Sequence, residues 1–165
     1  MTRLFVAAWP DAETVEQLSS LDWPVAPDIR RVPDRNLHIT LRFLGDVDPR
    51  AATDLLSTAT LPVATATLGP SVERLDGRQI VVPVAGVDPL AAAVRSATAA
   101  IGQHDPRPFR GHITIARTRR GGPSTIVEAP VLGTFTIAEV ALVASDLQPT
   151  GAVYSTLATF STTPR

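Results

Sequence analysis

Two histidines, each followed two residues later by a threonine, stand in near-identical stretches of the chain. The first stretch reads HITL at 38–41, and the second reads HITI at 112–115, 74 residues later. Successive side chains of an extended strand alternate between faces, so each His-Thr pair points to one side and the aliphatic residues point to the other. A single such strand most often holds a half-buried histidine satisfied by its neighbours. Two copies with the same alternation favour one shared functional site.

Paired imidazoles could serve three kinds of chemistry. A metal site needs a third protein ligand, but the spacing of the histidines is unfavourable and His104 lies in a polar segment where solvation is expected. A Ser-His-Asp system needs a serine on a sharp turn and an orienting acid, and the sequence marks neither. Acid–base catalysis by the two histidines themselves therefore fits best.

The unperturbed histidine pKa of about 6.5 suits this acid–base role near neutral pH. One imidazole can be neutral and accept a proton, while the other, held near an anionic phosphate, is protonated and donates one. In-line displacement at phosphorus needs such groups on opposite sides, and Thr40 and Thr114 can donate to the non-bridging oxygens. This chemistry needs neither metal nor cofactor. It needs a substrate with an internal leaving group, such as a cyclic phosphodiester.

Arginines gather around both histidine stretches although the net charge of the chain is −1. All 15 basic residues are arginine, and the windows 30–42 and 107–120 contain a single acid, Asp34. Arginine forks suit phosphate oxygens, so a phosphorylated or nucleic-acid ligand is expected between these windows. The nine arginines are Arg30, Arg31, Arg35, Arg42, Arg107, Arg110, Arg117, Arg119 and Arg120.

The composition is that of an ordinary globular protein, and we expect one domain over residues 1–165. The hydrophobic fraction is 44%, and the absence of cysteine excludes disulfides, a thiol nucleophile and cysteine-ligated metals. No apolar run approaches the roughly 18 residues of a membrane span, and residues 1–6 enter a strand directly instead of a signal peptide. A soluble, cytoplasmic and monomeric protein is expected.

The order strand, helix, proline-rich connector, histidine strand occurs twice, at 3–43 and at 79–117. Such a repeat predicts packing about a pseudo-twofold axis that brings the two histidine strands together. Asp48-Pro49 predicts a further helix, and 118–123 reads as a loop. The remaining predicted strands are 63–68, 71–75, and a closing hairpin formed by 133–145 and 153–160, whereas Gly45 is predicted to end the first histidine strand.

The motifs extend beyond the histidines to RLFVA at 3–7, NLHITLRFLG at 36–45, PFRGHITIAR at 108–117 and SDLQPTGAVY at 145–154. Together they resemble the bacterial and archaeal RNA 2′,3′-cyclic phosphodiesterases, also called 2′-5′ RNA ligases, of the two-histidine phosphoesterase superfamily. The resemblance implies a bilobal α+β fold in which two antiparallel sheets with outer helices flank a central cleft. It also implies hydrolysis of RNA 2′,3′-cyclic phosphate ends to 2′-phosphomonoesters, with 2′-5′ ligation as the related reaction.

By this resemblance His112 is the base that activates water and His38 is the acid that protonates the leaving 3′-oxygen. Thr40 and Thr114 would bind the phosphate, and Phe43 and Arg117, each five residues after its histidine, would contact the terminal nucleotide. Five is an odd offset, so these two side chains reach the site only if a strand end, a twist or a bulge follows each threonine.

Two alternatives remain open at the positions after the threonines, and two at the level of function. Phe43 could instead pack in the core, and Arg42, which shares the parity of His38, could bind the phosphate. The chain could be a non-catalytic RNA or nucleotide-binding module, or a phosphodiesterase for another small cyclic phosphate.

Overall fold

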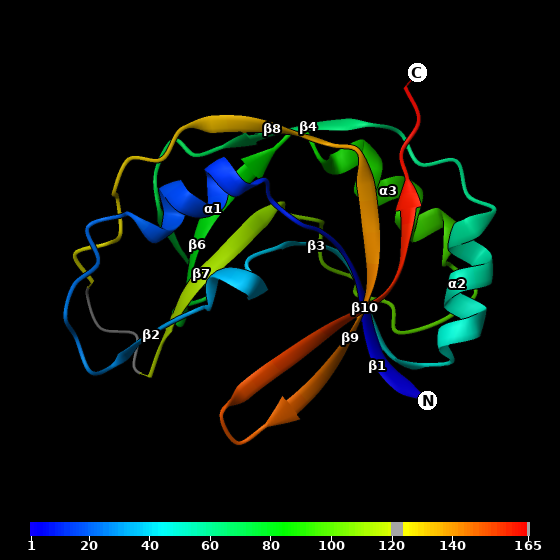
Figure 1. Cartoon of the computed structure of the whole chain (residues 1–165), viewed down its shortest axis with the longest axis horizontal. Coiled ribbons are helices and arrows are strands. Elements are labelled where there is room, and N and C mark those ends of the chain that lie inside the picture. Colours follow the sequence, from blue (N-terminus) through cyan, green and yellow to red (C-terminus); the bar gives the residue numbers. More distant parts are fainter. Residues whose placement is uncertain (120–123, 165) are drawn as a thin grey trace.

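One curled antiparallel sheet with helices packed against it forms the framework of the protein. The computed structural model describes residues 1–119 and 124–164, and within these residues it contains ten strands and three α-helices (Figure 1). This arrangement confirms the predicted α+β class. No helix in the described part of the chain is long and apolar enough to cross a bilayer.

The order of the strands places the two halves of the repeat side by side. The sheet runs β10-β9-β1-β3-β7-β6-β4-β8, with β2 beside β7 and β5 beside β6. The strands are β1 (Thr2–Ala8), β2 (Ile29–Arg31), β3 (Ile39–Val47), β4 (Ala64–Leu68), β5 (Glu73–Leu75), β6 (Gln79–Ala85), β7 (His112–Thr118), β8 (Gly133–Ile137), β9 (Glu139–Gln148) and β10 (Gly151–Ser161). The helices are α1 (Ala12–Ser19), α2 (Pro49–Ser57) and α3 (Asp88–Ala97), with a 3₁₀ turn at Asp34–Asn36.

The two predicted sheets are continuous at their centre. The histidine strands β3 and β7 are antiparallel neighbours joined at one residue pair, Ile39 with Ile113. In an antiparallel pair the flanking residues meet in reverse order, so His38 lies on the side of Thr114 and Thr40 on the side of His112. The pseudo-symmetric halves therefore meet where the predicted site residues stand.

The strand register shows that the repeat keeps an offset of 74 residues over more than the histidine motif. Ala7 pairs with Thr40 in the β1–β3 ladder, and Val81 pairs with Thr114 in the β6–β7 ladder. Phe5 pairs with Phe43, and Gln79 pairs with Arg117. β1-α1-β3 and β6-α3-β7 are thus equivalent units, with Phe5 and Gln79 at equivalent positions.

The helices cover one face of the sheet and leave the histidines on the other. Leu18 of α1, Leu56 of α2 and Leu90 of α3 belong to the same buried cluster as the strand residues Ile39 and Ile113. Because side chains alternate along a strand, the neighbouring histidines and threonines point away from this core. A second, smaller cluster lies on that other face and contains Phe5, Ala7, Ala141 and Val143, with Trp9 and Tyr154 packed against it.

Two predicted boundaries are wrong. Gly45 does not end the first histidine strand: its φ of +79° accompanies a second register shift against β1, and β3 continues to Val47. The segment 133–145 is not one strand, because β8 pairs with β4 whereas β9 pairs with β1 and β10. Residues 120–123 of the predicted loop lie outside the described residues.

Candidate active site

The two imidazoles are oriented in the same way by backbone carbonyls. Nδ1 of His38 lies 2.7 Å from the carbonyl oxygen of Asn36, and Nδ1 of His112 lies 2.7 Å from that of Arg110, in each case two residues earlier. A carbonyl oxygen only accepts hydrogen bonds, so Nδ1 carries the hydrogen in both rings. Nε2 is therefore the atom of each histidine that can take up or release a proton.

The first half-site, formed by His38, Thr40 and the rings of Phe5, Trp9 and Tyr154, is walled by aromatic groups. The ring centroids of Phe5, Trp9 and Tyr154 lie 4.9, 5.8 and 5.4 Å from that of His38. Nε2 of His38 lies 3.0 Å from Oγ1 of Thr40. Burial lowers the pKa of His38, against the hydrogen bond to the Asn36 carbonyl, which raises it. The free protein thus favours the neutral imidazole here.

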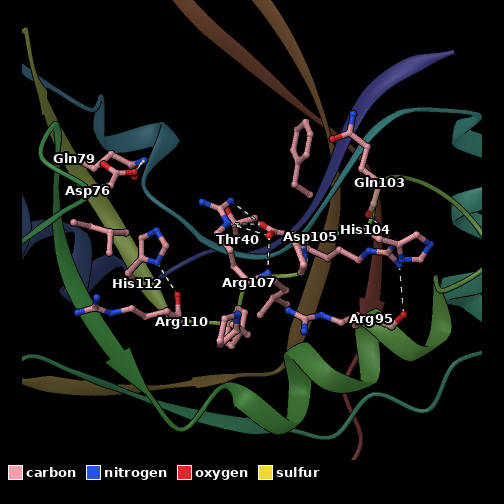
Figure 2. A pocket seen from close by; sticks show the side chains of 17 residues that line it. Thr40, Asp76, Gln79, Arg95, Gln103, His104, Asp105, Arg107, Arg110 and His112 are labelled. Carbon is pink, nitrogen blue, oxygen red and sulfur yellow. Dashed lines mark hydrogen bonds and ion pairs between the residues drawn. The ribbon is translucent and has the colours of Figure 1, made fainter.

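The second half-site, formed by His112, Thr114, Gln79 and Asp76, is polar and more open. Thr114 Oγ1 donates to Oε1 of Gln79 at 3.2 Å, and Nε2 of Gln79 donates to Oδ2 of Asp76 at 3.2 Å. Figure 2 shows Gln79 and Asp76 beside His112. Among the described residues, none forms a hydrogen bond with Nε2 of His112. This nitrogen is free to accept a proton from a bound molecule.

A cavity of about 680 Å³ is lined by Thr40 of the first half-site and by part of the second. Figure 2 shows the residues around it. Its walls include Thr40 and Phe43 from β3, Gln79 from β6 and His112 from β7, and the exposed connector 103–110 borders it. His38 is not among the lining residues, since the three aromatic rings surround it. Thr114 and Arg117 do not line the cavity either. Of the predicted histidine and threonine positions, Thr40 and His112 border it, and the pairing of Ile39 with Ile113 places the other two at the same junction of the strands.

A bulge after each threonine resolves the odd offset of Phe43 and Arg117. Val6 and Ala7 are adjacent in β1, but their partners Arg42 and Thr40 are two residues apart in β3, so β3 carries one extra residue here. β7 carries one extra residue at the equivalent place. Each bulge reverses the alternation, as the sequence required. The ring of Phe43 is 37% exposed and lines the cavity, with the Arg3 guanidinium 4.8 Å from its centroid. Core packing for Phe43 is thus excluded, and Arg117 is close enough for its charge to lower the pKa of His38.

The same bulge corrects the alternative for Arg42. It turns Arg42 toward the helices, where the side chain is only 8% exposed and its guanidinium donates to Thr98 and to carbonyl oxygens at the end of α3. Further bonds reach the carbonyl oxygens of Ile101 and Gln103 at 2.9 and 3.1 Å. Arg42 therefore holds the end of α3 and the start of the connector, and both of its Nη atoms are already engaged.

The other clustered arginines are only partly available to a ligand. Arg110 pairs with Glu73 and Arg107 with Asp105, at 2.8 and 2.7 Å, and hydrogen bonds from Arg107 hold the pKa of Asp105 at about 2. Both acids come from outside the basic windows. Arg30 donates to the Thr150 carbonyl, and Arg31 stacks on Trp23. Arg35 is exposed. Arg119 is also exposed, and Arg120 lies outside the described residues.

Several site residues escape the motif-based prediction. Tyr154 reaches His38 from the far end of the chain, although it stands within the 145–154 motif. Gln79 stands 74 residues after Phe5, at the equivalent position of the repeat. The sequence allows this alignment, but no motif marks Gln79 as a site residue. Within residues 1–119 and 124–164 no group of three or more His, Asp or Glu side chains converges in a way that could hold a metal ion.

Comparison with known proteins gives concordant results. A family model described as LigT-like phosphoesterase matches residues 9–68. The RNA 2′,3′-cyclic phosphodiesterase of Geobacillus stearothermophilus is 34% identical over 146 residues, which cover 78% of this chain and 46% of that protein. The chain thus spans less than half the length of this curated relative.

Solved structures match over almost the whole chain. The crystal structure of E. coli LigT in apo form is 30% identical, with a TM-score of 0.81 and coverage of 98% of each chain. E. coli LigT complexed with 3′-AMP is 28% identical, with a TM-score of 0.83 and the same coverage. A protein of Thermus thermophilus is 28% identical, covers 96% of this chain and 97% of that one, and has a TM-score of 0.70. With its duplicated His-x-Thr strands, the chain belongs to the LigT-like phosphoesterases of the two-histidine phosphoesterase superfamily.

Proposed function

We propose that the protein hydrolyses the 2′,3′-cyclic phosphate at an RNA end to a 2′-phosphomonoester by paired histidine catalysis, without a metal. The observation that carries this proposal is the common orientation of the two imidazoles, each with Nδ1 on a carbonyl and Nε2 as its exchanging atom, on adjacent strands. The activity carried in the name of the Geobacillus stearothermophilus relative supports the choice of substrate.

In the proposed reaction, water attacks phosphorus while Nε2 of His112 takes a proton from it. The bond between phosphorus and the 3′-oxygen breaks, and protonated Nε2 of His38 gives its proton to that oxygen. The products are a 2′-phosphate and a 3′-hydroxyl, and solvent returns both histidines to their starting states. Thr40 donates to a non-bridging oxygen. The hydroxyl hydrogen of Thr114 is engaged by Gln79, so Thr114 is proposed to lie beside the phosphate without donating to it. A 5′-hydroxyl in place of water gives the 2′-5′ linkage.

The acid role of His38 requires a proton that the free protein does not favour. Burial lowers the pKa of His38, whereas an anionic phosphodiester beside it raises that pKa by charge attraction. Substrate binding is therefore proposed to load the proton onto His38. The nearby charges of His112 and Arg117, which lower the pKa of His38 in the free protein, are offset by the same anion.

The proposed activity is tested with a purified oligoribonucleotide that ends in a 2′,3′-cyclic phosphate, incubated with the protein in the presence of a chelator. We expect a 2′-phosphate product at a rate that the chelator does not change. Absence of turnover contradicts the proposal, and a 3′-phosphate product reverses the assumed positions of acid and base.

The nature of the substrate is tested in the same assay. An adenosine 2′,3′-cyclic phosphate and a cyclic phosphate of ADP-ribose replace the oligonucleotide, and kcat/KM is compared. We expect the highest kcat/KM for the oligonucleotide. A higher value for either small molecule assigns the site to that substrate, and tight binding of all three without turnover identifies a non-catalytic module.

A further inference from the structure

The two half-sites differ most at one pair of equivalent positions, Phe5 and Gln79. Both precede a bulge in the pairing with their histidine strand, where Phe5 pairs with Phe43 and Gln79 with Arg117. Phe5 packs its ring against His38, and a phenyl ring offers no strong acceptor to a hydroxyl. Gln79 offers an amide, which bonds to Thr114. The same fold position thus places an apolar group in one half-site and an acceptor in the other.

The chemistry of its neighbours fixes the orientation of the Gln79 amide. The Asp76 carboxylate only accepts, so the amide nitrogen of Gln79 faces it at 3.2 Å, and Oε1 faces Thr114 at 3.2 Å. Oε1 also only accepts, so the hydroxyl hydrogen of Thr114 points to Gln79. A threonine hydroxyl has one hydrogen, and this one is therefore not directed at His112.

The first half-site shows what a His-x-Thr strand does without such an acceptor. There the hydroxyl of Thr40 lies 3.0 Å from Nε2 of His38. In the second half-site Nε2 of His112 has no hydrogen-bond partner among the described residues. Gln79 thus stands in the half-site where Nε2 of the histidine has no such partner, and Phe5 stands in the half-site where it has one.

We propose that Gln79 is a positioning residue that holds the hydroxyl of Thr114 away from His112 and so keeps Nε2 of His112 free for the attacking water. This inference rests on the proposed function, in which His112 is the base. Without the Gln79 acceptor, the Thr114 hydroxyl turns to Nε2 and competes with water for the same lone pair. Breaking one ordinary hydrogen bond before each proton transfer slows turnover by roughly tenfold.

Gln79→Leu removes the acceptor and keeps a side chain of similar bulk. We expect kcat to fall roughly tenfold with little change in KM, because the loss concerns the base and not substrate binding. The exchange of Gln79→Glu together with Asp76→Asn keeps an acceptor toward Thr114 and a hydrogen bond between the two side chains without placing two carboxylates together, so we expect it to restore a large part of the kcat lost in Gln79→Leu. A fall in kcat for Gln79→Leu that this exchange does not reduce, or an effect on KM alone, overturns the inference.

Gln148→Leu is the matched control, because Nε2 of Gln148 also donates to an aspartate, Oδ2 of Asp146, at 3.2 Å, on the exposed end of β9. We expect its kcat and KM to equal those of the wild type.

A second readout does not depend on turnover. The ¹⁵N resonance of Nε2 in neutral His112 is recorded for the wild type and for Gln79→Leu, and we expect it to move upfield in the variant as the nitrogen accepts a hydrogen bond. An unchanged resonance overturns the inference. If the resonance moves but the wild type turns over no cyclic phosphate, the arrangement of Gln79 and Thr114 stands, and the proposed function together with the role of His112 as base fails.

Discussion

The two half-sites share a backbone design but give their histidines different surroundings. Both fix Nδ1 on the carbonyl two residues before the histidine, and both carry a bulge after the threonine. His38 is enclosed by Phe5, Trp9 and Tyr154, and burial lowers its pKa, whereas His112 stands at the cavity beside Gln79.

A duplicated unit can in this way support two different proton-transfer roles. An enclosed imidazole exchanges protons mainly with a group that reaches into its pocket, such as the leaving oxygen of a bound substrate. An imidazole on an open, polar wall can meet water. The proposed assignment of acid to His38 and base to His112 follows this difference in access, while the shared orientation of the rings supplies the paired chemistry.

The largest expected effect is the loss of either imidazole. His38→Ala and His112→Ala should each lower kcat on a 2′,3′-cyclic phosphate by about 10³-fold, since each removes one proton-transfer group. Affinity for 2′-AMP, measured by calorimetry, should fall far less than kcat, and the decrease should be larger for His38→Ala, which removes the imidazole that is proposed to be protonated when the anion binds. His104→Ala removes the third, exposed imidazole and should leave kcat within about threefold of the wild type. Substantial activity in His38→Ala or His112→Ala contradicts catalysis by paired histidines.

The next effect concerns Arg42, which has no counterpart in the second unit because Ala116 occupies the equivalent position. Arg42→Met leaves several carbonyl acceptors at the end of α3 without donors and should lower the free energy of unfolding by about 3 kcal/mol, as measured by urea denaturation. Arg50→Met, at an exposed position of α2, should change it by less than about 0.5 kcal/mol. Equal decreases in the free energy of unfolding for the two variants contradict the conclusion that Arg42 holds the end of α3 in place.

Much of this comparison could be predicted from the sequence, and what could not has a physical cause. The His-x-Thr strands and the need for an irregularity after each threonine follow from local alternation of side chains, and the repeat follows from the order of the predicted elements. The position of Arg42 does not, because a bulge is defined by the pairing of two strands and reverses the alternation of every residue after it. Tyr154 and Gln79 belong to other strands, so their contacts with His38 and Thr114 are set by the fold and not by local spacing.

The next prediction concerns Phe43, which follows the bulge of β3 and is proposed to bind the nucleoside. Phe43 lines the cavity with an exposed ring, so Phe43→Ala should raise KM for adenosine 2′,3′-cyclic phosphate about tenfold through the loss of base stacking. The KM for a ribose 2′,3′-cyclic phosphate without a base should stay the same. If both KM values rise equally, Phe43 shapes the cavity and does not contact the base.

The smallest effect is on the pH dependence of stability. Because the pKa of folded His38 lies below the value of about 6.5 in the unfolded chain, the unfolded state binds more protons between the two values, and stability increases as pH rises through that window. His38→Gln removes this contribution. The stability of the wild type relative to the variant should therefore be greater at about pH 8 than at about pH 5, and an equal difference at both contradicts the enclosure of His38.

The assignment of different roles to the two half-sites is tested most directly by changing the leaving group. In a cyclic phosphate whose 3′-oxygen is replaced by sulfur, the thiolate leaves without needing a general acid. We expect His38→Ala to recover most of the wild-type kcat on this substrate, whereas His112→Ala should remain inactive. Recovery by His112→Ala and not by His38→Ala would show that the two half-sites carry the opposite roles.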